Sequence, residues 1–213
     1  MNKYQAFLFS LSILAPAITG VIRYRNIPVS YHPIIYLLLL GLANELTCYF
    51  FFYNTSNALP TNIYYLCEFL LLAWQFHNWK NILRVRWLYL VLITGMTLLW
   101  LTENIILGRL TMFSPVFQVV YSLSLILLAI NQLSWLVVND RGRILANPAF
   151  IISIAVIIFF SYKVLTEIFY YYAATGSIKN NIFVIESYLN VGYNIMLTIA
   201  IICIPPKSNF IQL

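Results

Sequence analysis

The sequence predicts an all-α protein, a polytopic membrane bundle of seven transmembrane helices. Of its 213 residues, 62% are hydrophobic and only 8% are charged, whereas soluble domains carry about 25% charged residues. The apolar residues form seven long runs, and about 20 apolar residues are enough to cross the hydrocarbon core of a bilayer. No run alternates with the roughly ten-residue strand period of an outer-membrane barrel. Because no polar linker divides the chain, residues 1–213 are expected to form a single integral membrane domain.

The first four predicted helices are bounded by residues that interrupt apolar runs. Pro16 predicts a kink inside the first helix, and Pro33 suits the first turn of the second. A turn-rich stretch at 54–60 precedes the third helix, and basic residues separate the third helix from the fourth. These helices are expected at about 5–22, 33–53, 62–78 and 87–107.

The last three predicted helices also begin or end at recognisable residues. Ser114-Pro115 is a start signal for the fifth helix, and Asn147 is a candidate N-cap of the sixth. Pro205-Pro206 ends the seventh, because proline cannot continue a helix without losing a backbone hydrogen bond. These helices are expected at about 113–138, 148–172 and 182–204.

The distribution of Lys and Arg predicts the orientation of the helices, because basic residues concentrate in cytoplasmic loops. Three basic residues lie on one side of the predicted bundle: Lys3, Arg109 and Lys179. Eight lie on the other side: Arg23, Arg25, Lys80, Arg84, Arg86, Arg141, Arg143 and Lys207. The twelfth, Lys163, lies inside a predicted helix. We therefore expect the N-terminus outside and the C-terminus in the cytoplasm.

The sequence lacks the residues that several functional classes require. The net charge of +6 is assigned to cytoplasmic loops and not to nucleic-acid binding, since no DNA-binding motif is present. The three cysteines, Cys48, Cys67 and Cys203, lie in apolar runs without C-x-x-C spacing. Two histidines cannot form a three-His zinc site, and neither H-E-x-x-H nor G-x-S-x-G occurs. We therefore predict no metal site, no cofactor and no catalytic nucleophile.

Acidic residues are expected to gather in the outer half of the membrane, where the predicted helices place Glu45, Glu68, Glu103, Glu167 and Glu186. A charge in hydrocarbon costs about 2.5–3.5 kcal/mol on insertion scales. These carboxylates are therefore expected to face a protein interior or a wet cavity. Lys163 and Glu167 are four residues apart and share a helical face. Their partners are expected to be the other intramembrane acids, Glu45, Glu68 and Glu186. The pair either is a structural ion pair that fixes helix packing or contributes to a binding site.

Polar residues continue the helical faces that carry the glutamates. One stripe of the seventh helix carries Glu186, Asn190, Tyr193 and Asn194. Tyr64 and Gln75 share a face with Glu68 on the third helix, and Gln118 and Tyr121 share a face of the fifth. A bound cation, a polar solute or protons would offset the excess negative charge of this cluster. Interhelical contacts between protonated or hydrogen-bonded glutamates are the alternative. The candidate binding residues are Glu45, Glu68, Lys163, Glu167, Glu186, Asn190, Asn194, Gln118 and Tyr121.

An internal repeat is a further hypothesis. Helices one to three and five to seven would form two parallel triplets joined by helix four, as in some transporters. Glu45 would then correspond to Glu167, and Glu68 to Glu186. The local sequences A-N-E-L and L-T-E-I match only weakly, so coincidence in an apolar chain is the alternative.

The segment Asn62–Lys80 combines an aromatic pair, the sequence E-F-L-L-L and an aromatic-rich end. It resembles a segment of small uncharacterised seven-helix integral membrane proteins of bacteria, a family without a settled activity. The resemblance implies seven helices and a role for Glu68. With the composition, it leads us to expect a bacterial inner membrane.

Three functional hypotheses follow from the polar centre. The leading one is transport or binding of a small cationic or polar solute, or of protons, at the outer carboxylates. The alternative is a non-transporting sensor or accessory subunit, which acts through a membrane partner or a second copy of the chain. The third is an intramembrane enzyme that uses paired carboxylates as acid and base.

Overall fold

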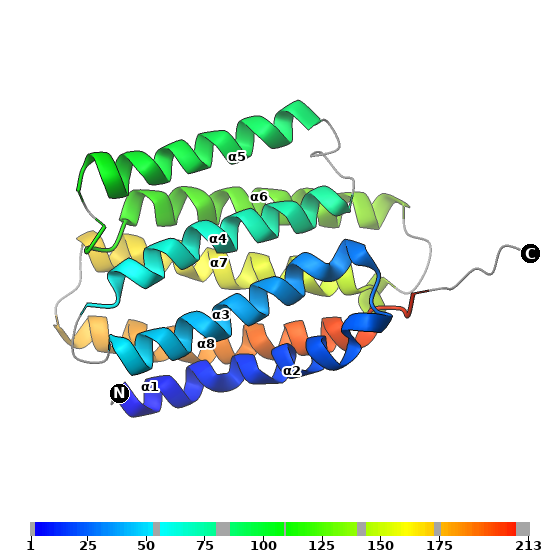
Figure 1. The fold of residues 1–213 in the computed structure, drawn as a ribbon, viewed down its shortest axis with the longest axis horizontal. Helices are drawn as coiled ribbons and strands as arrows, with labels where there is room; N and C mark the ends of the chain where they lie inside the picture. Colours follow the sequence, from blue (N-terminus) through cyan, green and yellow to red (C-terminus); the bar gives the residue numbers. More distant parts are fainter. Residues whose placement is uncertain are drawn as a thin grey trace, which may run out of the picture.

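The computed structural model describes residues 3–52, 56–79, 86–108, 110–139, 144–172 and 176–207. Over these ranges the chain is helical apart from short connections, and it contains no strand. The prediction of an all-α protein is therefore confirmed. Figure 1 shows the long helices lying side by side, with successive helices running in opposite directions.

The α-helices of the described chain are, in order, α1 (Lys3–Ser10), α2 (Leu14–Arg23), α3 (His32–Phe51), α4 (Ala58–Asn78), α5 (Arg86–Leu101), α6 (Pro115–Asn139), α7 (Pro148–Tyr172) and α8 (Gly176–Cys203). A short 3-10 turn, Leu11–Ile13, separates α1 from α2, so these two helices together replace the first predicted helix. Pro16 explains the break, because its ring clashes with the carbonyl four residues earlier and it lacks an N–H. The irregularity thus lies one turn before the predicted kink.

Within the described part of the chain, six helical segments are long and apolar enough to cross a membrane: Phe7–Asn26, Val29–Phe51, Arg86–Ile106, Pro115–Asn139, Pro148–Phe169 and Val184–Cys203. They agree with six of the seven predicted spans and fit a membrane protein. The remaining helix, α4, is not among them. Its buried face carries Asn62, Glu68 and Gln75, which lower its apolar character.

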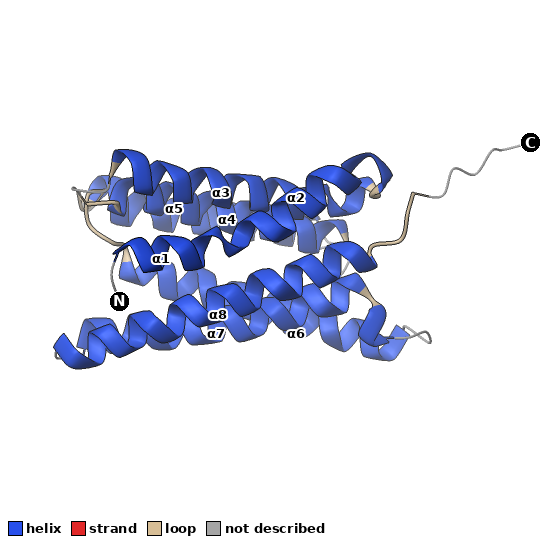
Figure 2. Cartoon of the chain, turned by 90° about the horizontal axis from the view of Figure 1, so that it is seen from below, coloured by secondary structure: helices blue, strands red, loops and turns tan. Residues whose placement is uncertain are grey.

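Most of the helices form a closed ring. The α1–α2 pair packs against α8 and α3, α3 packs against α4, α4 against α6, α6 against α7, and α7 against α8. Helix α5 packs against α4 and α6 and lies at the edge of the bundle (Figure 1). Figure 2 shows α2 to α5 above α6, α7 and α8. The centre of the molecule is therefore enclosed by helices that are distant in the sequence.

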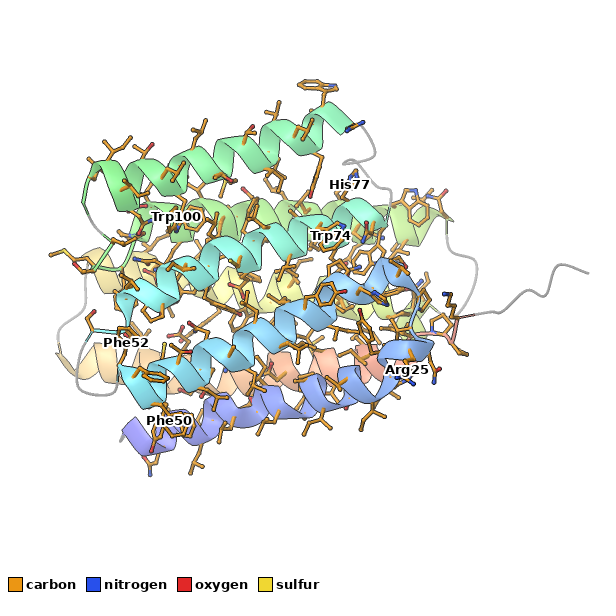
Figure 3. All side chains as sticks on the ribbon, viewed as in Figure 1. Arg25, Phe50, Phe52, Trp74, His77 and Trp100 are labelled. Atoms are coloured by element: carbon orange, nitrogen blue, oxygen red, sulfur yellow. The ribbon has the colours of Figure 1, made fainter. Side chains whose placement is uncertain are left out.

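One end of the bundle is filled by apolar side chains. These side chains come from the parts of α3, α4, α7 and α8 that lie toward Arg25, and they include Ile34, Ile35, Leu72, Phe76, Ile152 and Ile201, each no more than 2% exposed. Figure 3 shows Arg25 at this end and Phe52 at the opposite end. The filled core thus occupies one half of the bundle and leaves space in the other.

Arg23 joins two helices at the filled end. Its guanidinium donates hydrogen bonds to the backbone carbonyls of Ile201, Ile202 and Ile204, and the bond from Nη2 to Ile204 measures 2.8 Å. The last carbonyls of a helix have no partner within the helix, so this cation satisfies the end of α8. The backbone N–H of Lys207 also donates to the carbonyl of Asn26 over 2.7 Å. The end of α2 is therefore tied to the end of α8.

We predict that Arg23→Met lowers the free energy of unfolding in detergent by about 1.5–3 kcal/mol, the usual range for hydrogen bonds to a charged group. Arg25→Met is the matched control, because Arg25 lies two residues away and is exposed. Chemical unfolding followed by circular dichroism measures both variants. An equal loss of stability in the two variants would contradict the role of Arg23.

Candidate functional site

The open half of the bundle contains a cavity of about 650 Å³, lined by residues of α1, α3, α4, α7 and α8 and of their connections. Ligand sites for small molecules usually measure about 300–1,000 Å³. Phe52 lines the cavity at the end of the bundle that lies opposite Arg25 (Figure 3). Asn57 and Phe113 also line it and lie just before α4 and α6, which begin at the same end (Figure 1). Asn57 and Phe113 are exposed, so the mouth of the cavity lies at this end.

The cavity brings together seven of the nine candidate binding residues, which are Glu45, Glu68, Lys163, Glu167, Glu186, Asn190 and Asn194. They come from α3, α4, α7 and α8, so residues far apart in the sequence share one wall. The other two, Gln118 and Tyr121, lie on α6 and do not line the cavity. The predicted polar centre therefore corresponds to an enclosed space between the helices.

Lys163 is held by a buried polar network. Its ammonium lies 3.6 Å from Oε2 of Glu68, donates a hydrogen bond to the hydroxyl of Tyr121, and lies 3.8 Å from the centre of the Tyr65 ring. Glu68 accepts hydrogen bonds of 3.0 Å from the hydroxyls of Tyr64 and Tyr121. The charges are thus paired and hydrogen-bonded, as buried charges must be. Tyr121 takes part in the site through this network.

The carboxylate within 4 Å of the Lys163 ammonium belongs to Glu68 on α4 and not to Glu167, so the close ion pair joins two helices, and its carboxylate is one of the predicted partners. Side chains on a helix tilt toward its N-terminus, so Lys163 leans away from Glu167. A lysine that precedes a glutamate by four residues also pairs less well than the reverse order. Glu167 is half-buried and lines the cavity.

Three carboxylates line the cavity without a lysine or arginine of their own. Glu45, Glu167 and Glu186 are half-buried, whereas Glu68 is only 3% exposed. Lys163 is the one basic side chain among the described residues that line the cavity, and its nearest carboxylate is that of Glu68. The cavity therefore holds more acidic than basic groups.

No protein-family model, curated protein or solved structure matches the chain. Function is therefore inferred from the chemistry of the cavity.

Glu103 has a different place from the other glutamates. Its carboxylate accepts hydrogen bonds from the backbone N–H groups of Val116, at 3.3 Å, and Phe117, at 2.7 Å. These N–H groups belong to the first turn of α6, where they have no partner within the helix. Glu103 therefore caps α6 and does not line the cavity.

Gln118 is buried at 1% exposure, and neither its side-chain oxygen nor its nitrogen has a hydrogen-bond partner within the described structure. The same face of α6 carries Ser122, whose hydroxyl is also buried without a partner. The structure thus places Gln118 inside the protein but outside the cavity wall.

Aromatic side chains form much of the cavity wall. They are Phe7, Phe9, Tyr49, Phe52, Tyr64, Tyr65, Phe113, Phe159 and Tyr193. The helical spacing predicted that Tyr64 and Tyr193 share polar faces with Glu68 and Glu186, whereas the other rings were not predicted to face the site. The rings of Phe7 and Phe159 depend on tertiary packing, and the sequence contains no signal for their position.

The four carboxylates that line the cavity come from four helices, α3, α4, α7 and α8. Across the described parts of the chain, no group of three or more His, Cys, Asp or Glu side chains is arranged to hold a metal ion. The cavity thus combines carboxylates with aromatic rings.

We predict that Lys163→Met destabilises the protein by about 3–5 kcal/mol, because it leaves a buried carboxylate without its cation. Adding Glu68→Gln should recover much of this loss, since it removes the uncompensated charge. Adding Glu167→Gln is the matched control and should recover less. Unfolding free energies in detergent measure all three variants, and an equal recovery by the two glutamate substitutions would contradict the observed pairing.

Proposed function

We propose that this protein is a seven-helix membrane protein that binds a small cationic solute in the cavity and carries it across the membrane. The observation that supports this proposal is the set of three half-buried carboxylates, Glu45, Glu167 and Glu186, in a cavity whose one lysine is paired with Glu68. Negative charges in a membrane interior are costly. A bound cation lowers this cost, and so does protonation in the absence of solute.

Helix α4 is proposed as the seventh span. It has 21 residues, and at 1.5 Å per residue it is about 31 Å long, which matches the hydrocarbon thickness of about 30 Å. It packs against α3, α5 and α6, so its polar face meets protein and not lipid. Its exposed large side chains are apolar and include Ile63 and Trp74.

The orientation follows from the basic residues. Arg23, Arg25, Arg86 and Lys207 lie at helix ends or connections on the side of the bundle opposite the cavity mouth. Basic residues favour the cytoplasmic side. We infer that the cavity opens to the outside of a bacterial inner membrane and that the C-terminus is cytoplasmic.

The order of helices in the ring supports two parallel repeats, α1–α4 and α6–α8, joined by α5. Within each repeat, successive helices are neighbours, and the repeats meet where α4 packs against α6 and where α8 packs against α1–α2. A two-fold axis along the membrane normal would give this order. Glu45 would correspond to Glu167 and Glu68 to Glu186, and all four line the cavity. Transporters built in this way bind their solute between the halves.

The orientation can be tested with fusion reporters. A reporter fused to the C-terminus should be active in the cytoplasm, and one inserted after Asn57 should be active outside, because Asn57 lies at the cavity mouth. Alkaline phosphatase and green fluorescent protein provide the two readouts. A cytoplasmic signal at Asn57 would contradict the proposed orientation and place the cavity mouth on the inner side.

Cation binding can be tested with purified protein in nanodiscs. We expect Glu45→Gln, Glu167→Gln and Glu186→Gln each to weaken binding of ammonium or alkylammonium ions at least tenfold, because each removes a negative charge from the cavity. Glu103→Gln is the matched control, since Glu103 caps α6 outside the cavity. Isothermal titration calorimetry measures the affinities.

Uptake of the same ions by reconstituted vesicles distinguishes the functional candidates. Transport is supported if the vesicles take up the ions and if each of the three substitutions abolishes this uptake. Binding without uptake contradicts transport and favours the sensor or accessory subunit. Absence of cation binding contradicts the proposal as a whole.

A further inference from the structure

Lys163 shows what kind of group the cavity wall accommodates. Its side chain is an alkyl chain that ends in an ammonium, and it is 6% exposed. The ammonium lies beside one carboxylate and within 6 Å of the ring centres of Tyr65, Tyr121, Phe159 and Phe160. Aromatic faces attract cations within about this distance. The wall of the cavity therefore already binds an alkylammonium group through a carboxylate and aromatic rings.

The carboxylates and the apolar floor of the cavity lie at different depths. On α3, Leu38 lies about two turns before Glu45, and on α7, Phe159 lies about two turns before Glu167. Two helical turns correspond to about 11 Å. Both helices run toward the cavity mouth (Figure 1), so the carboxylates lie nearer the mouth and the floor lies deeper.

The floor is apolar. It is formed by Leu37, Leu38, Phe159 and Leu197, which all line the cavity, and its three leucines are 1–3% exposed. A hydrated inorganic cation gains nothing from such a surface, because hard cations prefer oxygen ligands. An apolar group that leaves water gains free energy in proportion to its buried area. The deep part of the cavity thus favours the apolar part of an organic molecule.

Tyr193 provides an independent indication of a ligand. It lines the cavity, it is 8% exposed, and its hydroxyl is buried with no hydrogen-bond partner among the described residues. Its ring stacks on Phe159 of the floor with 4.5 Å between the ring centres. Buried hydroxyl groups in native proteins are nearly always hydrogen-bonded. The unpaired hydroxyl marks a place where a ligand can supply the missing partner.

We propose that the cavity takes an amphipathic organic ammonium ion, with its charged nitrogen among Glu45, Glu167 and Glu186 and its alkyl or aryl part on the floor formed by Leu37, Leu38, Phe159 and Leu197. This inference rests on the proposed cation-binding function and names the class of solute. The separation of about 11 Å between carboxylates and floor fits a primary amine with a chain of about six carbons, or an arylalkylamine of similar length.

A series of straight-chain ammonium ions tests the proposal, from methylammonium to hexylammonium, with sodium and potassium as inorganic probes. The affinity of wild-type protein in nanodiscs for these ions should rise about fourfold with each added methylene. This factor corresponds to the transfer free energy of one methylene that leaves water. Equal affinity for sodium, methylammonium and hexylammonium would overturn the solute class and leave cation binding intact. Absence of binding by every probe would overturn the proposed function itself.

A substitution in the floor locates the apolar part of the ligand. Leu38→Asn should reduce the dependence of affinity on chain length to less than about twofold per methylene, because it makes the floor polar. Leu38→Met is the matched control, because it keeps an apolar floor and should keep the dependence. A chain-length dependence that persists unchanged in Leu38→Asn would overturn the proposed orientation.

Two further variants keep the proposal testable if Leu38→Asn fails to fold. Leu38→Ala deepens the floor and should shift the tightest binding to a longer chain, and an unchanged optimum would overturn the proposal. Tyr193→Phe should weaken binding of tyramine relative to phenethylamine, which differ by one hydroxyl. If the ratio of the two affinities is the same in Tyr193→Phe as in the wild type, the role of Tyr193 is overturned.

Discussion

The buried ion pair between Lys163 and Glu68 is the interaction on which the arrangement of the cavity depends. It connects α7 with α4, and Tyr121 adds a link to α6 through its hydroxyl. A lysine in an apolar core is tolerated only where a carboxylate and hydrogen bonds compensate the loss of water. The pair therefore fixes the relative position of three helices at the depth of the cavity. Such pairs specify an arrangement more than they stabilise it.

The same pair influences the charge of the cavity. Lys163 pairs with Glu68 and also interacts electrostatically with Glu167 and Glu186, so one ammonium faces several carboxylates among the described cavity residues. Glu45, Glu167 and Glu186 are half-buried, whereas Glu68 is buried. Glu103, in contrast, lies outside the cavity and is hydrogen-bonded at the start of α6. The described cavity thus holds more carboxylates than ammonium groups.

The sequence predicted the features that depend on composition and local spacing. Apolar runs identified the helices, and the cost of charge in lipid placed Glu45 and Glu186 on inward faces. Glu68 was among the predicted partners of Lys163, but the i, i+4 rule, which considers one helix, also pointed to Glu167, and the packing of α7 against its neighbours selected Glu68. Tyr49, at the end of its helix, fits a lipid interface equally well, so its place in the cavity wall depended on tertiary packing. The break before Pro16 differed from the prediction by one turn, since proline acts on the preceding turn.

Two sets of polar contacts connect helices of the ring at different depths. Lys163, Glu68 and Tyr121 connect α7, α4 and α6 beside the cavity, whereas Arg23 connects α2 and α8 at the filled end. A solute in the cavity meets the apolar core before it can reach the end that carries Arg23. The proposed transport would require the bundle to open at that end, where Arg23 donates hydrogen bonds to the last carbonyls of α8. Under this proposal, a separation of α2 from α8 would break these hydrogen bonds, whereas the network around Lys163 lies at a different junction of the ring.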